Sequence, residues 1–490
     1  MRKILLLLLA VILVLAAVTV TRALGLDSRQ LQVAPLPPRP VPLAALADTL
    51  SQAIALRTVS YQEESQLDTA AFAALHQLLA DRFPRVQQAL EREVVSGWSL
   101  FYRWPGSDPS LAPVLLTGHL DVVPVDPDTT GAWLHPPFAG EQAEGYVWGR
   151  GAIDDKGGVI TVLGAVESLL EQGFAPRRSV WLFFGQDEEA SGRQGAAGFA
   201  ARLEKEGVHP YLLLDEGLPL ADGIFPGIQN PVAMIRIAEK GYLTLELAAT
   251  ADGGHSSMPP RQTAVGIVAQ ALARLEAHPQ PARLDGAAAQ MFAYLAPELP
   301  LGQRLFLANR WLFGPLVLRS LLDEPSSAAM VRTTTAATVF QGGVKENQLP
   351  SRATALVNFR LLPGDSAGEV IERVRRAVED PRVSIRPTTP LPESHPPSEV
   401  EGAAFETLMR TAREVIPDAV VVPALLVGTS DARYYERFCR NVYGFRPFLL
   451  NSQDLKRFHG LNERVALSDL ERMVRFYARL IEATSQVPKG

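Results

Sequence analysis

Apolar runs and segments with helical spacing alternate along much of this chain. Three short apolar runs, bounded by turn residues, have the pattern of buried parallel strands: residues 113–118, 179–185 and 211–214. Segments with the apolar spacing of helices precede and separate them: residues 42–55, 69–79, 157–170 and 194–206. This order predicts an α/β fold, with a mostly parallel sheet flanked by helices and ligands beyond the carboxyl ends of its strands.

The pattern changes near Met234. Residues 235–249 and 353–360 alternate apolar and polar side chains, as half-exposed antiparallel strands do, and helical spacing follows each of them. We expect a small α+β domain inserted in the large one. Helices at 401–415 and 468–483 then return to the large domain. The expected division is 43–233 and 387–490 for the large domain and 234–386 for the inserted domain.

The amino terminus carries a separate signal. Residues 4–20 are an unbroken apolar run after Met1-Arg2-Lys3, and a Pro-rich stretch follows. Because no convincing small-x-small cleavage site follows the run, we interpret residues 1–22 as an uncleaved signal anchor, with a cleaved signal peptide as the alternative. The basic lead stays cytoplasmic, which places the body in the periplasm, lumen or extracellular space, or secretes it after cleavage. Residues 23–42 are expected to be a semi-rigid spacer.

The amino-acid composition argues against several classes of protein and kinds of site. With 490 residues and 47% apolar content, the chain can bury a large core in more than one domain. The net charge of -6 and the lack of a basic block argue against nucleic-acid binding. Cys439 is the single cysteine, so an intramolecular disulfide and a cysteine-based zinc cluster are both excluded.

Acidic and imidazole side chains follow the expected strands. They are His119 with Asp121, Asp154 with Asp155, Glu188 with Glu189, Asp215, and, further along the chain, His255 and His459. Each cluster alone has an ordinary explanation, such as a loop histidine, a helix N-cap or a solvated acidic loop. Their recurrence at successive strand ends instead favours a hydrolytic zinc or manganese site, because oxygen ligands mixed with imidazoles and without thiolates suit such ions.

These motifs together resemble the co-catalytic zinc exopeptidase family of bacterial glutamate carboxypeptidase, carnosinase and the aminoacylases. The likeness covers about residues 43–483. Within the family, the sequence is most similar to the Gly-X carboxypeptidases and the secreted N-acyl amino acid synthase/hydrolases. The motifs that carry it are His119-x-Asp121, Gly149-Arg150-Gly151-Ala152-x-Asp154-Asp155-Lys156-Gly157, Asp187-Glu188-Glu189, Leu214-Asp215-Glu216-Gly217, Gly254-His255-Ser256-Ser257 and His459-Gly460-x-Asn462-Glu463.

The resemblance implies two zinc ions, with cobalt or manganese as substitutes. Asp154 would bridge them and precede a cis peptide bond to Asp155. The remaining ligands would be His119 and Asp215 for one ion, and Glu189 and His459 for the other. Glu188 would be the general base, and Asp121 would orient His119.

The same resemblance implies that the large domain is catalytic and that the inserted α+β domain is a lid of the dimerisation type. It also implies roles in substrate recognition. His255 would stabilise the oxyanion, often across a dimer, although a turn histidine is the plainer interpretation. Asn347 matches a position that contacts substrate, and the loop at Gly428 resembles one that lines the substrate pocket. Arg360 would pair with a substrate carboxylate, unless it forms a structural ion pair.

One segment departs from the compact form of the family. Residues 291–322 lengthen the lid with apolar helical stretches, which would be ordinary core, an acyl-chain pocket or a surface resting on the membrane. The insertion leaves open whether the usual homodimer forms and whether His255 acts in its own subunit.

The sequence therefore predicts an extracytoplasmic, membrane-anchored di-zinc amidohydrolase or carboxypeptidase. It would cleave the amide bond next to a free carboxylate in a short peptide or an N-acyl amino acid. The alternatives are a deacylase or synthase of fatty-acyl amino acids without peptidase action and, from another class, a non-catalytic binding protein.

Overall fold

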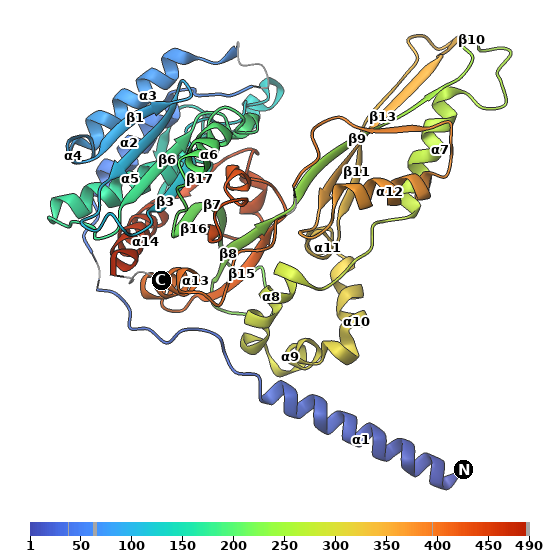
Figure 1. The fold of residues 1–490 in the computed structure, drawn as a ribbon, viewed down its shortest axis with the longest axis horizontal. Helices are drawn as coiled ribbons and strands as arrows, with labels where there is room; N and C mark the ends of the chain where they lie inside the picture. Colours follow the sequence, from blue (N-terminus) through green and yellow to red (C-terminus); the bar gives the residue numbers. More distant parts are fainter. Residues whose placement is uncertain (38, 62–65, 394, 487–490) are drawn as a thin grey trace.

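A computed structural model describes residues 1–37, 39–61, 66–393 and 395–486, and its largest element is an eight-stranded sheet (Figure 1). The strand order is β1-β2-β6-β3-β7-β16-β8-β15. The strands are β1 (Glu91–Val95), β2 (Ser99–Trp104), β3 (Val114–His119), β6 (Val180–Gly185), β7 (Leu212–Ala221), β8 (Val232–Glu239), β15 (Val420–Leu426) and β16 (Val442–Leu450). The central strands β6, β3, β7 and β16 run parallel, which confirms the expected fold class.

Helices cover both faces of this sheet. They are α2 (Leu43–Ala55), α3 (Thr69–Arg82), α4 (Pro84–Ala89), α5 (Lys156–Glu171), α6 (Ala196–Lys205), α13 (Ala403–Val415) and α14 (Leu467–Gln486). Along β3, Val114 and Leu116 join the core under α5 and α14, whereas Leu115 joins a second core with Phe199 of α6. Alternate residues of one strand are therefore buried on opposite faces, which explains why the strand is apolar throughout.

A small sheet connects the last part of the chain to the loop before α5. It contains β4 (Glu141–Ala143), β5 (Tyr146–Trp148) and β17 (Arg464–Ala466), in the order β17-β5-β4. Short 3-10 helices complete the large domain: η2 (Pro127–Ala132), η3 (Glu188–Ala190), η5 (Asp431–Tyr434) and η6 (Asp454–Arg457). The pairing of β17 with β5 brings residues 459–463 beside residues 149–154.

The lid is an antiparallel sheet with two helices on it. The sheet order is β11-β13-β9-β14, formed by β9 (Gly241–Thr250), β11 (Thr334–Gly342), β13 (Arg352–Leu361) and β14 (Ser384–Pro387). Helices α7 (Ala264–Ala277) and α12 (Ala367–Val378) share its apolar core. At the lid tip, β10 (Gly254–His255) pairs with β12 (Gln348–Leu349). We call these two strands and the residues between and beside them the lid tip.

The expected strand at 235–249 is two strands in the structure. Its first part is β8 in the large sheet, and its second part is β9 in the lid sheet, with Lys240 between them. The ammonium of Lys240 is buried and donates to the carbonyls of Ala329 (2.9 Å) and Arg332 (2.8 Å). The chain therefore crosses between the domains at Lys240, a few residues after the boundary that alternation suggested.

The lengthened segment is helical, and only its beginning is core. Helix α8 (Gly286–Leu295) packs on β15 and shares the large core through Met291. After η4 (Ala296–Glu298) come α9 (Leu301–Ala308), α10 (Arg310–Leu322) and α11 (Pro325–Val331). Neither α9 nor α10 contains a buried residue.

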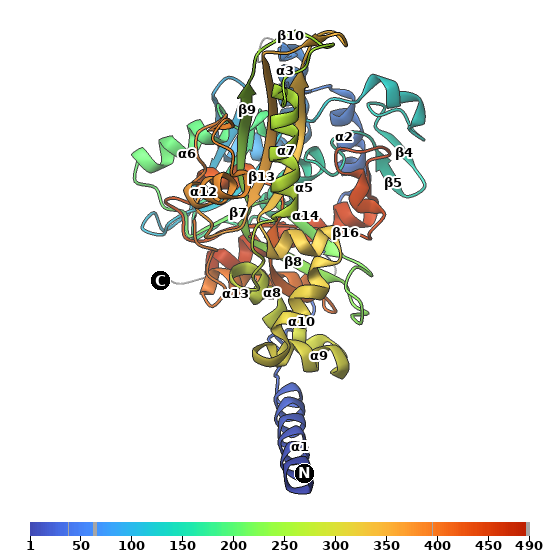
Figure 2. The same cartoon turned by 90° about the vertical axis from the view of Figure 1, so that its right-hand side faces the viewer.

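Helix α1 (Arg2–Leu24) projects from the body beside α9 (Figure 2). It is long and apolar enough to cross a bilayer, a property that N-terminal signal sequences share. The segment after it, which was expected to be a semi-rigid spacer, contacts the body. Gln30 is buried and exchanges two hydrogen bonds with the backbone of Val421 in β15, so this part of the chain lies against the body.

Candidate metal centre

His119 ends β3, where its ring lies between two carboxylates. Its Nδ1 is 3.0 Å from the backbone oxygen and 3.3 Å from Oδ1 of Asp121, and its Nε2 is 2.9 Å from Oδ1 of Asp154. The side chain is only 1% exposed. Asp121 therefore fixes the direction of the ring, so that Nε2 points at Asp154, as expected for a metal ligand and its orienting carboxylate.

Asp154 lies on the loop before α5, and the peptide bond from Asp154 to Asp155 is cis, as the resemblance implied. The buried Glu463 holds this loop: its Oε1 accepts from the amides of Gly151 (3.0 Å), Ile153 (2.9 Å) and Asp154 (3.2 Å). A charged pair with Arg150 completes the contact at 2.7 Å. One acceptor thus fixes three backbone amides and sets the place of Asp154.

The second oxygen of Asp154 faces a different imidazole. Its Oδ2 is 3.2 Å from Nε2 of His459, which is also 3.2 Å from Oε2 of Glu189. The other oxygen of Glu189, Oε1, is buried and has no hydrogen-bond partner among the described residues. Asp154 is therefore placed between two sets of ligand atoms.

Two groups of potential ligands share Asp154. One contains His119, Asp154 and Glu216, the other Asp154, Glu189 and His459, and within each group the ligand atoms lie within 4.8 Å of one another. A further group, His119 with Glu188 and Glu189, overlaps both. Carboxylates and imidazoles at this spacing fit a pair of divalent cations that share one carboxylate.

Asp215 has partners away from this cluster. Its Oδ1 accepts from Thr117 (2.6 Å) and its Oδ2 from Ser430 (2.8 Å), whereas Oε2 of the next residue, Glu216, is 3.6 Å from Nε2 of His119. Adjacent side chains of a strand point to opposite sides, so only one of these two acids can face the cluster. The structure brings Glu216 there, a residue to which the sequence assigned no role.

Negative charge is concentrated in the centre. Burial and the nearby Asp154 raise the pKa of Glu216 to about 8, while the hydrogen bonds that His459 donates to Asp154 and Glu189 raise its pKa to about 10. Burial and the charges of Glu216 and Asp431 raise the pKa of Glu188 well above its usual range. Acids that repel one another in a buried site favour a cation, which compensates their charge.

Asp121 supports more than His119. Its buried carboxylate also accepts from the hydroxyl of Ser60 (2.6 Å) and from the amides of Glu188 (3.2 Å) and Glu189 (3.1 Å). The same side chain therefore positions the ends of β3 and β6 relative to each other.

Asp155 and Arg446 form a second support that the sequence did not indicate. Asp155 accepts from the amide of His119 (2.9 Å) and from Nη2 of Arg446 in β16 (2.7 Å). A Cβ atom at Gly158 would meet the Arg446 guanidinium, so the glycine leaves room for this buried pair. Gly118 leaves room for the same pair, because a Cβ atom there would meet the Asp155 carboxylate and Nη2 of Arg446.

The residues expected to bind substrate fall into two places. Arg360, on β13 near the domain junction, stacks 4.7 Å from the ring of Tyr242, and its Nη1 is buried without a hydrogen-bond partner among the described residues. Gly428 lies in the loop after β15, two residues before Ser430, whose hydroxyl binds Asp215 and Glu239. Both positions are therefore close to the junction of the lid and the large domain.

His255 and Asn347 lie together at the lid tip. The amide of Ser256 donates to the carbonyl of Asn347 (3.1 Å), and both His255 and Asn347 are exposed. In Figure 1, β10 is at the far end of the lid from β3 and β6. The structure does not bring either residue to the metal cluster of the same chain.

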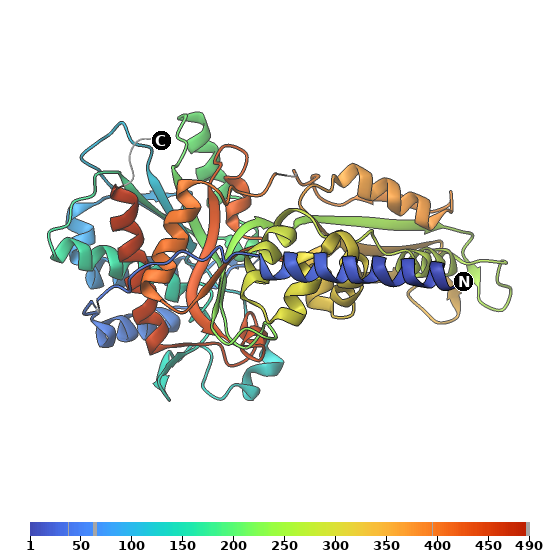
Figure 3. The same cartoon turned by 90° about the horizontal axis from the view of Figure 1, so that it is seen from below.

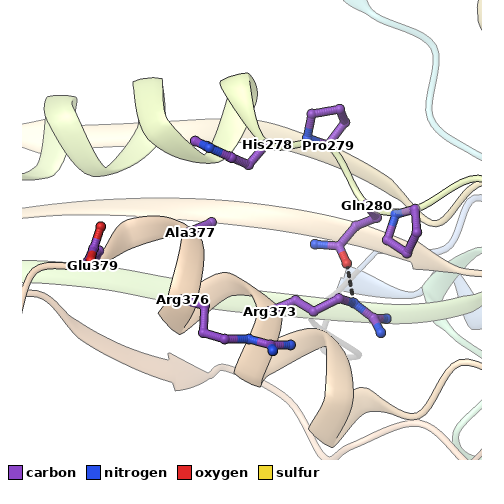
Figure 4. A pocket seen from close by; sticks show the side chains of 8 residues that line it. His278, Pro279, Gln280, Arg373, Arg376, Ala377 and Glu379 are labelled. Atoms are coloured by element: carbon purple, nitrogen blue, oxygen red, sulfur yellow. Dashed lines mark hydrogen bonds between the residues drawn. The ribbon is translucent and has the colours of Figure 1, made fainter.

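A cavity of about 310 Å³ lies elsewhere in the lid, between α7 and α12 (Figure 4). Gln280 and Arg373 line it and are joined by a hydrogen bond of 2.7 Å. None of the described residues of the metal cluster lines this cavity, so it is separate from the chemistry.

Comparisons with known proteins agree with the geometry. A probable carboxypeptidase S-like 2 of Dictyostelium discoideum is 39% identical over 90% of this chain and 85% of its own length. An N-fatty-acyl-amino acid synthase/hydrolase PM20D1 of Xenopus tropicalis is 40% identical over 89% and 85%. Both relatives are named as hydrolases of peptide or acyl-amide bonds, and this chain is a hydrolase.

Solved structures share the fold. Human carnosine dipeptidase 1 has a TM-score of 0.65 at 16% identity and covers 91% of this chain and 97% of its own. A metallo-carboxypeptidase from Sulfolobus solfataricus has a TM-score of 0.64 at 18% identity and covers 91% and 99%. The model of peptidase family M20/M25/M40 matches residues 115–483, and the chain belongs to this family.

Proposed function

We propose that this hydrolase is a di-zinc amidohydrolase or carboxypeptidase that cleaves the amide bond next to a free carboxylate in short peptides or N-acyl amino acids. The observation that carries the proposal is Asp154, one carboxylate shared by two groups of potential ligands. Carboxylates and imidazoles without thiolates suit zinc, with cobalt or manganese as substitutes. The unpartnered Oε1 of the buried Glu189 fits a ligand as well.

The ligand assignment follows the two groups. His119, Asp154 and Glu216 would hold one ion, and Asp154, Glu189 and His459 the other. Glu216 takes the place that the resemblance gave to Asp215, because both oxygens of Asp215 already accept from hydroxyl groups.

Glu188 is the proposed general base. Two bound divalent cations supply Lewis acidity, which polarises the scissile carbonyl and makes a water molecule easier to deprotonate. Glu188 accepts the proton of the attacking water and then donates it to the nitrogen of the leaving amine. The hydrogen bond that the amide of Glu188 donates to Asp121 holds this residue in place.

Arg360 is the proposed partner of the substrate carboxylate. Its buried, unpartnered Nη1 is a donor that a carboxylate would satisfy. Burial lowers the pKa of Arg360, and the positive charge of Arg433 lowers it further, so an anion between the two guanidinium groups would be favoured. Gly428, which has no side chain, would leave room for substrate in the adjoining loop.

His255 is proposed to act across a homodimer. The exposed imidazole at the lid tip would stabilise the oxyanion in the metal centre of a second copy, and Asn347 would contact substrate beside it. The hydrogen bond between Nδ1 of His255 and Ser257 (2.8 Å) leaves Nε2 free to donate.

A second candidate is action on fatty-acyl amino acids alone. The exposed apolar helices α9 and α10 beside α1 favour it, because such a surface lies where lipids would be. The name of the Xenopus relative points the same way. A non-catalytic binding protein has no support, since every proposed catalytic group is present in a chain of a hydrolase family.

The location proposed is extracytoplasmic and membrane-anchored. Helix α1 carries Arg2 and Lys3 at its start and no further charge before Arg22, so it would cross the bilayer with its amino terminus in the cytoplasm.

The test is a hydrolysis screen of the purified full-length chain in detergent. Dipeptides, short and long N-acyl amino acids, and their carboxamide analogues would be compared before and after chelation and after zinc is restored. We expect zinc-dependent hydrolysis of free acids and little turnover of carboxamides. Activity that survives complete metal removal would contradict the mechanism, and hydrolysis restricted to long acyl chains would favour the second candidate.

A further inference from the structure

The contact between α1 and α9 falls at one end of the apolar stretch of α1. Side chains from Ile4 to Val18 are exposed, whereas Thr19 and Ala23 are buried against the body. The side-chain amide of Asn309, a residue between α9 and α10, donates a hydrogen bond to the backbone carbonyl of Thr19 at 2.9 Å. The helix from Arg2 to Thr19 is roughly 25 Å long, slightly less than the ~30 Å hydrocarbon core of a bilayer.

The length of α1 determines the depth of α9 relative to the bilayer. If the basic start of α1 lies at the cytoplasmic face, Thr19 lies near the outer boundary of the hydrocarbon core, and the helix that touches Thr19 lies at the same depth. Figure 2 shows α9 and α10 where α1 leaves the body, and Figure 3, seen from below, shows the two helices directly behind α1.

Helices α9 and α10 expose large apolar side chains at that level. They are Leu301, Phe306, Trp311, Leu312 and Leu316, with 39% to 58% of each residue exposed. The two helices meet at a bend of 111°, so they cannot form one straight span. Arg310 and Arg319 of α10 add positive charge, which suits phospholipid headgroups.

We propose that α9 and α10 form a membrane-docking surface that lies in the outer interface of the bilayer beside α1. The occupant is the lipid itself: the surface is continuous with a helix that would span the bilayer, and it combines aromatic, aliphatic and arginine side chains as interfacial segments do. This inference rests on the proposed anchoring by α1. The docked surface would hold the body in one orientation, with the lid tip pointing away from the membrane, since β10 lies at the opposite end of the molecule from α1 in Figures 1 and 2.

The test uses dye-labelled full-length protein in vesicles of phosphatidylcholine and phosphatidylglycerol. The buried Cys439 is first replaced by Cys439→Ser, and an environment-sensitive dye is attached at Leu316→Cys or, as a second position, Leu312→Cys. The matched control is Val94→Cys on β1, at the edge of the large sheet far from α1, where the residue is 46% exposed. We expect dye at 316 and 312 to emit at shorter wavelength and to be quenched several-fold more by acyl-chain quenchers than dye at 94.

Two outcomes would overturn the proposal. Dye at 316 and 312 that aqueous iodide quenches as well as dye at 94 would place the helices in water. Dye that is shielded from iodide but is not quenched by lipid-borne groups would mean that another protein copy covers the surface. Retention of the chain by vesicles in alkaline carbonate tests α1 alone, so a failure of the anchor is distinguishable from a failure of docking.

Discussion

The metal centre and the lid tip differ in how much of their geometry one chain supplies. In the centre, Asp121 accepts from Ser60 and from two backbone amides, and Glu463 accepts from three more, so the buried ligands are held from several sides. At the lid tip, His255 and Asn347 are exposed, and the nearest fixed partners of the His255 ring belong to Ser257. The ligands of the centre are preorganised by their own chain, whereas the exposed tip would take part in catalysis only where a second copy meets it.

Glu188 gives the largest expected effect on the centre. Glu188→Gln should lower kcat by about 10² to 10⁴, because the variant cannot accept the proton of the attacking water. Bound zinc, measured by mass spectrometry, should stay near the wild-type amount. The control is Glu204→Gln, which changes an exposed acid paired with Arg437 and should leave kcat unchanged. A kcat of Glu188→Gln within tenfold of wild type would contradict its role.

His255 tests whether the tip serves a second copy. His255→Ala should lower kcat by about 10² to 10³ if the imidazole stabilises an oxyanion. Mixing this variant with Glu188→Ala should then restore activity, to about a quarter of wild type for random pairing in a dimer, since one intact site forms in each mixed dimer.

One result of the mixing experiment would contradict action of His255 across a dimer. If each variant alone is inactive and the mixture is no more active than its components, His255 acts within its own chain. Size-exclusion chromatography of the mixture, with one variant carrying a tag, verifies that mixed dimers formed.

Variants of Asp215 and Glu216 test which of these two acids binds a metal ion and which one stabilises the fold. Glu216→Gln should weaken zinc binding at one of the two sites by at least about tenfold, because a ligand of that ion is lost. Asp215→Asn should retain both ions and instead lower the free energy of unfolding by about 1 to 3 kcal/mol, since Thr117 and Ser430 lose a charged acceptor. Competition with a chelator and chemical denaturation measure the two quantities. The opposite pattern would return the ligand role to Asp215.

Arg360 gives the smallest expected effect. Arg360→Ala should raise KM for free acids about tenfold, or about 1.4 kcal/mol, and change KM for carboxamide analogues little. Arg352→Ala, on the same strand and paired with Glu246 at 3.0 Å, is the matched control. An equal rise for acids and carboxamides would mean that Arg360 only supports the fold.

The sequence predicted the elements whose pattern is local. The helices at 42–55 and 157–170 and the strands at 113–118 and 179–185 occur within a few residues of the expected places. The strands β15 and β16 were not predicted, because Pro423 and Pro447 interrupt their apolar runs. The division of one expected strand into β8 and β9 at Lys240 was not predicted for another reason. The alternation of apolar and polar residues continues across Lys240, and this pattern does not tell which sheet a strand joins.

The candidate centre was anticipated in kind, and Asp121 was expected to orient His119, but no role was assigned to Glu463 or Arg446. Asp154, His119, Glu189 and His459 come together as the motifs implied. Which of Asp215 and Glu216 faces the cluster depends on the side of β7 that is turned toward it, and two adjacent acids give no local sign of that side. Arg446 was missed because its contact with Asp155 joins residues far apart in the chain.

The place of β16 in the large sheet also has a consequence for the timing of assembly. This strand, from the last part of the chain, lies between β7 and β8, and it is followed by His459 and Glu463. If α1 holds the amino terminus in the cytoplasm, as proposed, the residues after α1 would be translocated in chain order, and the early strands would be outside while the ion site is still incomplete. The proposed zinc site would be complete only when translocation is almost finished, so the metal would be acquired in the outer compartment.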